Sequence, residues 1–93
     1  MEKKILYLTL KKQWFDLINC GIKTEEYREI KNYWQKRFEN KHYDEVVFRH
    51  GYSKDAPSMS FVINSITIKE GREEWGAVKN QKYYVISLGK RIL

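Results

Sequence analysis

The sequence predicts a small α+β protein: a mostly antiparallel β-barrel with two short helices near its N-terminus. Most of the chain consists of runs rich in β-branched and aromatic residues, which favour strands. Two stretches in the first half instead repeat their apolar residues every three or four positions, as amphipathic helices do. With 93 residues the chain is long enough for one core but not for two, so residues 1–93 are expected to form a single domain.

The first 30 residues are predicted to contain a strand, a helix and a second strand. Residues 4–10 carry apolar side chains on both faces, which is typical of a central strand. Residues 12–20 change to a helical spacing, and Gly21 stands where a helix is expected to end. Residues 24–30 then favour a second strand.

The middle of the chain is predicted to add one helix and one strand. Residues 33–40 form the second helix, with Asn32 as its N-terminal cap. Residues 44–52 contain three consecutive apolar residues and form a strand, whereas residues 53–58 hold the single proline and form a loop.

The last third is predicted to contain two strands separated by a polar loop. Residues 59–69 are the longest run with strand character, and Asn64 and Ser65 indicate a bend or bulge within it. Residues 70–81 form the loop, and residues 83–92 form the final strand. Five strands of this length with two short helices suit a small barrel.

The composition points to an anionic partner and away from metals and membranes. A net charge of +6 favours nucleic acid, although the same lysines could serve only to keep a small protein soluble. Seven Tyr, four Phe and three Trp suggest a surface where rings meet flat ligands. Cys20 is the only cysteine, so no internal disulfide or cysteine-rich metal site is expected. No zinc-type cluster and no phosphate-binding glycine loop is apparent, so no metal or cofactor is expected. No apolar run is long enough to cross a bilayer and no signal peptide is apparent, so a cytoplasmic protein is expected.

Three charged residues, Lys23, Glu26 and Arg28, form the main candidate site. On an extended chain Glu26 and Arg28 share one face, while Glu25 and Tyr27 share the other. Lys23 lies at the turn before the strand, where it can be directed at the same place. From the residues alone, two interpretations stay open: a structural ion pair, or a pocket for a nucleobase or phosphate.

The motif Gly-x-Lys-x-x-Glu-x-Arg, formed by Gly21, Lys23, Glu26 and Arg28, resembles that of the ASCH family. The chain is similar to small bacterial and phage members of this family along most of its length. The similar stretches, in the same order, are residues 8–15, 48–52, 74–77 and 84–89. ASCH domains have a barrel related to the PUA fold, and the motif lines a cleft beside it. The resemblance therefore implies that a basic cleft binds RNA or a nucleotide, with these three charged residues at its centre.

Four further residues are predicted to bind the ligand at the rim of the site: Lys12, Arg49, Tyr52 and Trp75. Lys12 is expected to contact the ligand, whereas Trp14 is expected to anchor its helix to the core. Arg49 and Tyr52 lie at the end of a predicted strand and could stack on a base or contact a phosphate. Trp75 either closes over a ligand or plugs one end of the barrel.

Two alternatives remain beside RNA or nucleotide binding. The first is a hydrolase that acts on RNA or on a modified nucleoside, with Lys23 and Glu26 as catalytic candidates. Some ASCH proteins deacetylate an acetylated cytidine with a threonine three residues after the lysine, but Glu26 occupies that position here and Thr24 directly follows the lysine. The second alternative is a protein-interaction module. The sequence leaves the oligomeric state open.

Overall fold

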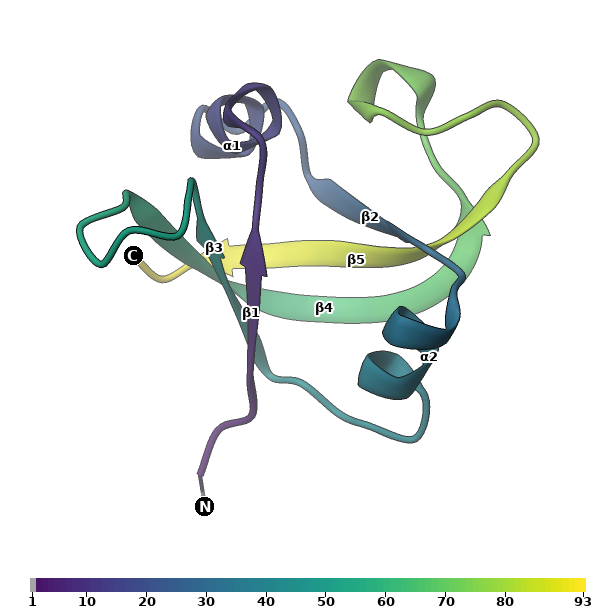
Figure 1. Cartoon of the computed structure of the whole chain (residues 1–93), viewed down its shortest axis with the longest axis horizontal. Helices are drawn as coiled ribbons and strands as arrows, with labels where there is room; N and C mark the ends of the chain where they lie inside the picture. The colour runs from purple at the N-terminus through teal and green to yellow at the C-terminus, as the bar shows by residue number, and fades with distance from the viewer. Residues whose placement is uncertain (1) are drawn as a thin grey trace.

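The computed structural model describes residues 2–93, which form five strands, two α-helices and a short 3₁₀ helix (Figure 1). In chain order the elements are β1 (Ile5–Thr9), α1 (Lys12–Asn19), β2 (Glu25–Glu29), α2 (Asn32–Phe38), β3 (Glu45–Arg49), β4 (Ser58–Glu70), η1 (Glu73–Trp75) and β5 (Lys82–Arg91). The predicted α+β class, the five strands and the two helices are thus confirmed.

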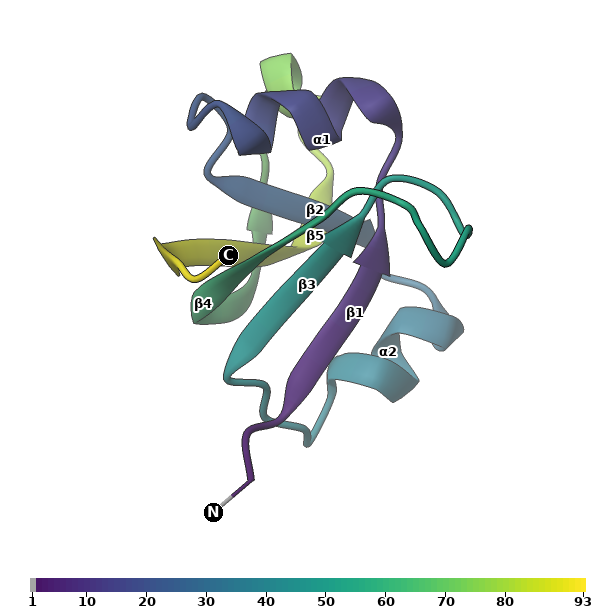
Figure 2. The same cartoon turned by 90° about the vertical axis from the view of Figure 1, so that its left-hand side faces the viewer.

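The five strands form one mixed sheet in the order β1-β3-β4-β5-β2. β1 and β3 are parallel and lie side by side in Figure 2, whereas the other three pairings are antiparallel. The long strand β4 curves through the sheet and pairs with β3 along one part and β5 along another. Its register with β5 shifts between Phe61 and Ser65, at the bulge that Asn64 and Ser65 predicted.

The predicted barrel is not closed. Within residues 2–93 no backbone ladder joins β1 to β2, the two strands at the edges of the sheet, so the sheet is a curled half-barrel. The main chain leaves the sheet at Thr9 and enters α1 three residues later, so β1 ends at the point where it approaches β2. A side chain spans the gap instead: Arg28 Nη2 of β2 donates to the Thr9 carbonyl at 3.1 Å. We call this place the sheet opening.

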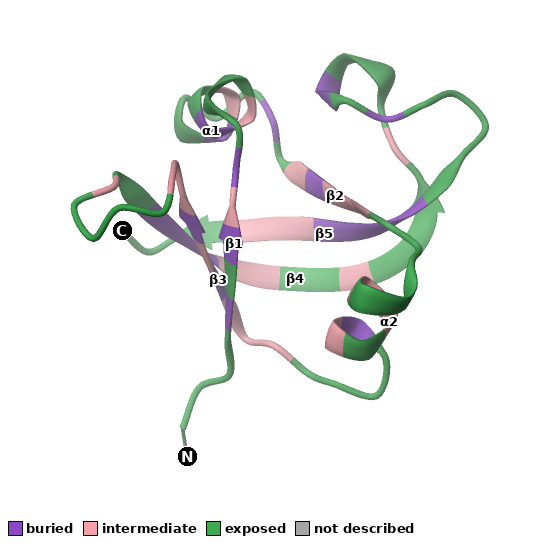
Figure 3. Cartoon of the chain, viewed as in Figure 1, coloured by how far each residue is buried: buried purple, intermediate pink, exposed green. Residues whose placement is uncertain are grey.

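The hydrophobic core lies on the inner face of the half-barrel. Buried and exposed positions alternate along β1, as Figure 3 shows. The core consists of Leu6, Leu8, Leu10, Phe15, Ile18, Phe38, Val46, Phe48, Met59, Phe61, Tyr84 and Ile86. On β2, Glu26 and Arg28 pair with Ile86 and Tyr84 and so face inward, whereas Tyr27 packs with Val85 on the opposite face. The predicted alternation of side chains along β2 is therefore correct.

Several element boundaries differ from the sequence prediction. Asn32 is the first residue of α2 rather than its cap, and Lys31 at the cap position makes no side-chain hydrogen bond to the helix. β3 ends at Arg49, because Gly51 adopts a left-handed φ of 99° in the following loop. The predicted loop of residues 70–81 contains η1, and Gly76, which directly follows this helix, also has a φ of 99°. Among the described helices, none is long and apolar enough to span a membrane.

Candidate functional site: an aromatic cavity at the sheet opening

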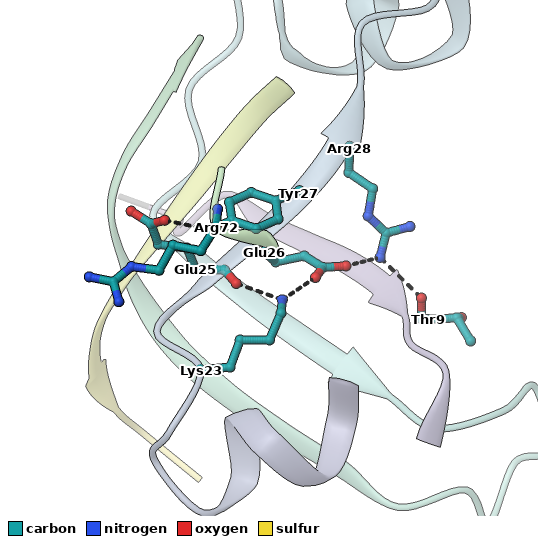
Figure 4. A network of polar contacts seen from close by, with 7 residues as sticks. All are labelled: Thr9, Lys23, Glu25, Glu26, Tyr27, Arg28 and Arg72. Atoms are coloured by element: carbon teal, nitrogen blue, oxygen red, sulfur yellow. Dashed lines mark hydrogen bonds and ion pairs between the residues drawn. The ribbon is translucent and has the colours of Figure 1, made fainter. Parts of the chain in front are cut away.

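Lys23, Glu26 and Arg28 are joined in one chain of polar contacts (Figure 4). Glu26 Oε1 accepts from Lys23 Nζ at 2.6 Å, and Glu26 Oε2 accepts from Arg28 Nη2 at 2.7 Å. Arg28 extends the chain to Thr9 across the sheet opening. The side chain of Lys23 has 0% of its surface exposed, Glu26 has 8% and Arg28 has 18%, so the contacts become more accessible from Lys23 toward Arg28.

The end of α1 directs Lys23 into this buried position. Gly21 adopts a φ of 85°, and the backbone N–H groups of Ile22 and Lys23 both donate to the Leu17 carbonyl. A Cβ at position 21 would meet open space, so the left-handed conformation is the reason for glycine here. This turn sends the Lys23 side chain beneath α1, where its ammonium also donates to the Glu25 carbonyl at 2.6 Å.

Burial governs the protonation of Lys23. The loss of water around the ammonium lowers the pKa of Lys23 from its ordinary 10.5, and the carboxylate of Glu26 opposes this effect. Two aromatic rings complete the surroundings, since Lys23 Nζ lies 5.6 Å from the ring centre of Trp14 and 5.3 Å from that of Tyr27. Carboxylate, carbonyl and ring faces together compensate a charge that is sealed from solvent.

The outer face of β2 holds the loop of residues 70–81 over the site. The Tyr27 hydroxyl donates to Glu25 Oε1 at 2.8 Å and accepts from the Arg72 backbone N–H at 3.0 Å. Burial is the main cause that raises the pKa of Tyr27, so the hydroxyl keeps its proton. Gly71 allows this close approach, because a Cβ there would lie 2.7 Å from the Tyr27 ring. The loop in turn carries Trp75 to the sheet opening.

A cavity of about 580 Å³ lies at the sheet opening, next to Glu26 and Arg28. Its walls come from the β1–α1 junction, β2, α2, the loop of residues 70–81 and the start of β5. All three tryptophans of the chain line it, together with two tyrosines. The complete lining is Thr9, Leu10, Lys11, Trp14, Glu26, Tyr27, Arg28, Glu29, Trp34, Trp75, Gly76, Val78, Gln81 and Tyr83.

Each of the three tryptophan rings has a cation nearby. Besides the contact of Lys23 with Trp14, Arg28 Cζ lies 5.0 Å from the ring centre of Trp34. Arg72 Cζ lies 4.8 Å from the ring centre of Trp75. Each ring therefore already satisfies its electrostatic preference for a positive charge.

The charges of the lining balance, so the cavity is less basic than the net charge of the chain suggested. Lys11 and Arg28 face two carboxylates, Glu26 and Glu29. Cations outside the lining neutralise those carboxylates: Lys23 bonds to Glu26, and Lys31 pairs with Glu29 at 3.2 Å. What remains for a ligand is the positive charge of Lys11 and Arg28.

The structure gathers some of the predicted site residues and separates others. Glu26, Arg28 and Trp75 line the cavity, and Lys23 lies behind Glu26 without lining it. The remaining three predicted residues, Lys12, Arg49 and Tyr52, are not among the lining residues.

These three residues have other surroundings. Lys12 forms an exposed ion pair with Asp16 at 2.7 Å. Arg49 donates to the Ser53 carbonyl at 2.6 Å and thereby braces the loop that follows β3. Tyr52 is 90% exposed on that loop.

Sequence reasoning missed four aromatic lining residues: Trp14, Tyr27, Trp34 and Tyr83. Trp14 was expected to anchor α1, but its ring lines the cavity and packs against Gly76, where a Cβ would approach to 2.8 Å. Their one common signal is the aromatic excess of the composition. That excess indicates a ring-lined surface without saying which rings form it.

Among the described residues, neither a metal site nor a hydroxyl hydrogen-bonded to Lys23 is present. Within residues 2–93 no group of three or more His, Cys, Asp or Glu side chains could hold a metal ion. The described hydrogen bonds of Lys23 Nζ go to a carboxylate and a carbonyl, not to a hydroxyl. Thr24 is exposed. Comparison of the chain with protein-family models, curated proteins and solved structures finds no match.

Proposed function

We propose that the cavity binds a single unpaired base of RNA, or a nucleotide, stacked among its tryptophan rings. The observation that carries the proposal is that all three tryptophans, Trp14, Trp34 and Trp75, line the same cavity as Arg28. Stacking of a base on an aromatic ring contributes about 1–3 kcal/mol. A volume of about 580 Å³ lies within the range of small-molecule sites, which is suited to one nucleotide rather than to a long strand.

The charges favour a neutral or anionic ligand over a cationic one. An aromatic cage can also bind quaternary ammonium groups, but here Lys23, Arg28 and Arg72 already lie near the tryptophan rings. A cationic ligand would meet like charges, whereas a phosphate would be attracted by Lys11 at the rim. Lys79 and Lys82 flank the lining residues Val78 and Gln81 in sequence and form no ion pair within residues 2–93.

The resemblance to the ASCH family leads to the same function by a separate route. Its motif places a lysine, a glutamate and an arginine at the proposed ligand site, and these correspond to Lys23, Glu26 and Arg28. The geometry assigns them different tasks. Arg28 reaches the cavity, Glu26 orients Arg28, and Lys23 neutralises Glu26 from behind.

Titration calorimetry with single-stranded RNA and with nucleoside monophosphates tests the proposal. We expect binding at about 50 mM salt that weakens as salt rises, since phosphate contacts release counterions from the nucleic acid. Arg28→Met and Trp34→Ala should each weaken binding, whereas Lys41→Ala, on the loop after α2, serves as a control for a lost positive charge. The proposal fails if nothing binds at low salt, or if Arg28→Met binds as well as the wild type.

Hydrolysis receives less support from the geometry than binding does. A lysine that activates a hydroxyl must lie beside it and have access to the substrate. Lys23 is sealed behind Glu26, and its hydrogen-bond partners among the described residues are oxygen acceptors of Glu25 and Glu26. Incubation with acetylated cytidine or with RNA, followed by chromatography of the products, checks this alternative directly.

A further inference from the structure

The polar floor of the cavity consists of Glu26 and Arg28, and its carboxylate is already occupied. Oxygen Oε1 of Glu26 accepts from Lys23 at 2.6 Å and Oε2 accepts from Arg28 at 2.7 Å. Glu26 as a whole is 6% exposed. Both of its oxygens therefore face protein cations, and the burial of the side chain leaves them little contact with a ligand.

Arg28, in contrast, keeps unused donors. Its Nη2 atom is engaged with Glu26 Oε2 and with the Thr9 carbonyl. Its Nε atom is buried and has no hydrogen-bond partner within residues 2–93. Nη1 likewise makes no hydrogen bond to the described part of the chain. Because Nε is shielded from solvent, Nη1 is the donor that a ligand can reach, and an acceptor there would form a charge-assisted hydrogen bond.

The geometry points to a site that selects flat rings by their hydrogen-bond acceptors, a refinement that rests on the proposed nucleotide binding. The floor would prefer bases with a keto group at C4 of a pyrimidine or C6 of a purine, as in uracil, hypoxanthine and guanine, over cytosine and adenine, which carry an amino group at that position. A keto oxygen accepts from Arg28, whereas an amino group would direct its own donors at the guanidinium. Arg28 is the specificity-determining residue in this scheme.

Lys23 is the positioning residue of the same scheme. Its ammonium occupies Glu26 Oε1 and so prevents the carboxylate from accepting an amino group of the ligand. Without Lys23 the freed oxygen becomes an acceptor beside the cavity. Lys23→Met should therefore reduce the ratio of the affinities for keto and amino bases. If Lys23 only stabilised the fold, its replacement would leave this ratio unchanged.

Two matched ligand pairs test this selectivity on the wild-type protein. Uridine and cytidine monophosphates differ in a keto against an amino group and in the proton on the neighbouring ring nitrogen, as do inosine and adenosine monophosphates. Calorimetry at low salt should give an affinity about ten- to a hundred-fold higher for the keto member of each pair, the factor expected from one well-placed arginine contact. Because the ligand and not the protein is varied, a folding defect cannot produce the result.

The protein variants then assign the selectivity to its residues. Arg28→Met should bring the two members of each pair within about three-fold of one another, with Lys41→Ala, away from the cavity, keeping the wild-type ratio. Circular dichroism of each variant reports whether it is folded. Equal binding of both members of a pair, or a preference for the amino member, would overturn the proposed selectivity of Arg28 for keto groups but not the proposed binding of nucleotides. Failure of all four nucleotides and of RNA to bind would overturn both proposals.

Discussion

Removal of the charge at Glu26 should expose how much the protein depends on this one carboxylate. Glu26→Gln keeps the shape and one oxygen acceptor but leaves the buried ammonium of Lys23 without a counter-charge. Removing one member of a buried ion pair typically costs about 3–5 kcal/mol. The Arg28 guanidinium, at 18% exposure, can regain part of its lost interaction from water, so the cost falls mainly on Lys23.

The chemistry of Lys23 sets an upper limit on the stability that Glu26→Gln can lose. The variant can always avoid a buried unpaired charge by releasing the Lys23 proton. Removing the proton at pH 7 from a lysine with the ordinary pKa of 10.5 costs about 5 kcal/mol, at about 1.4 kcal/mol for each pH unit. Both routes give a similar value, which is a large part of the roughly 5–15 kcal/mol that stabilises a typical domain.

Urea unfolding followed by circular dichroism measures this loss, with Glu29→Gln as the matched control. Glu29 lies on the same strand and pairs with Lys31 at 3.2 Å, but both side chains are more than half exposed. The control should therefore change the free energy of unfolding by no more than about 0.5 kcal/mol. The loss in Glu26→Gln should shrink as pH rises toward 10.5, and the double variant Lys23→Met/Glu26→Gln should be more stable than Glu26→Gln alone.

The reasoning is refuted if Glu26→Gln and Glu29→Gln lose similar stability. It is also refuted if the loss in Glu26→Gln does not depend on pH, because Lys23 would then not be the group that carries the cost.

Three further predictions concern Lys23, Gly76 and Arg49. Burial lowers the pKa of Lys23 below 10.5, so just below that pH the unfolded chain binds more protons than the folded chain. The wild type should therefore gain stability relative to Lys23→Met as pH rises toward 10.5, and urea midpoints at several pH values measure this gain. Gly76→Ala should cost about 1–3 kcal/mol and shift tryptophan fluorescence, because φ is 99° and the new Cβ would lie 2.8 Å from the Trp14 ring; an unchanged thermal midpoint would contradict this. Arg49→Ala should speed proteolysis of the loop after β3, since it removes the bond to the Ser53 carbonyl, and should leave the affinity for uridine monophosphate unchanged; weaker binding would return Arg49 to the site.

Much of the secondary structure could be predicted because it depends on local patterns. The alternation along residues 24–30 correctly placed Glu26 and Arg28 on one face and Tyr27 on the other. Asn64 and Ser65 correctly marked the bulge in β4. Helix capping was harder, because Asn32 satisfies the preferences of both a cap and a first-turn residue, and the local pattern does not separate the two.

Closure of the sheet and the membership of the site depended on contacts between distant segments. β1 does not pair with β2 because the main chain leaves the sheet at Thr9. Arg28, which is 19 residues from Thr9 in the sequence, spans the gap with its side chain. Trp14, Trp34 and Trp75 come from three separate elements, and no local spacing relates them. Lys12 and Arg49 satisfied every local criterion for binding but lie outside the cavity, because the curl of the sheet sets which side chains meet.

The sequence by itself determined the class of the fold, the order of its elements and the convergence of Lys23, Glu26 and Arg28, since these follow from periodicity and from a turn within a few residues. The tertiary structure alone decided that Lys23 is sealed while Arg28 reaches the cavity. Burial depends on what packs above a residue, and here that is α1 over Lys23 and an open edge of the sheet beside Arg28.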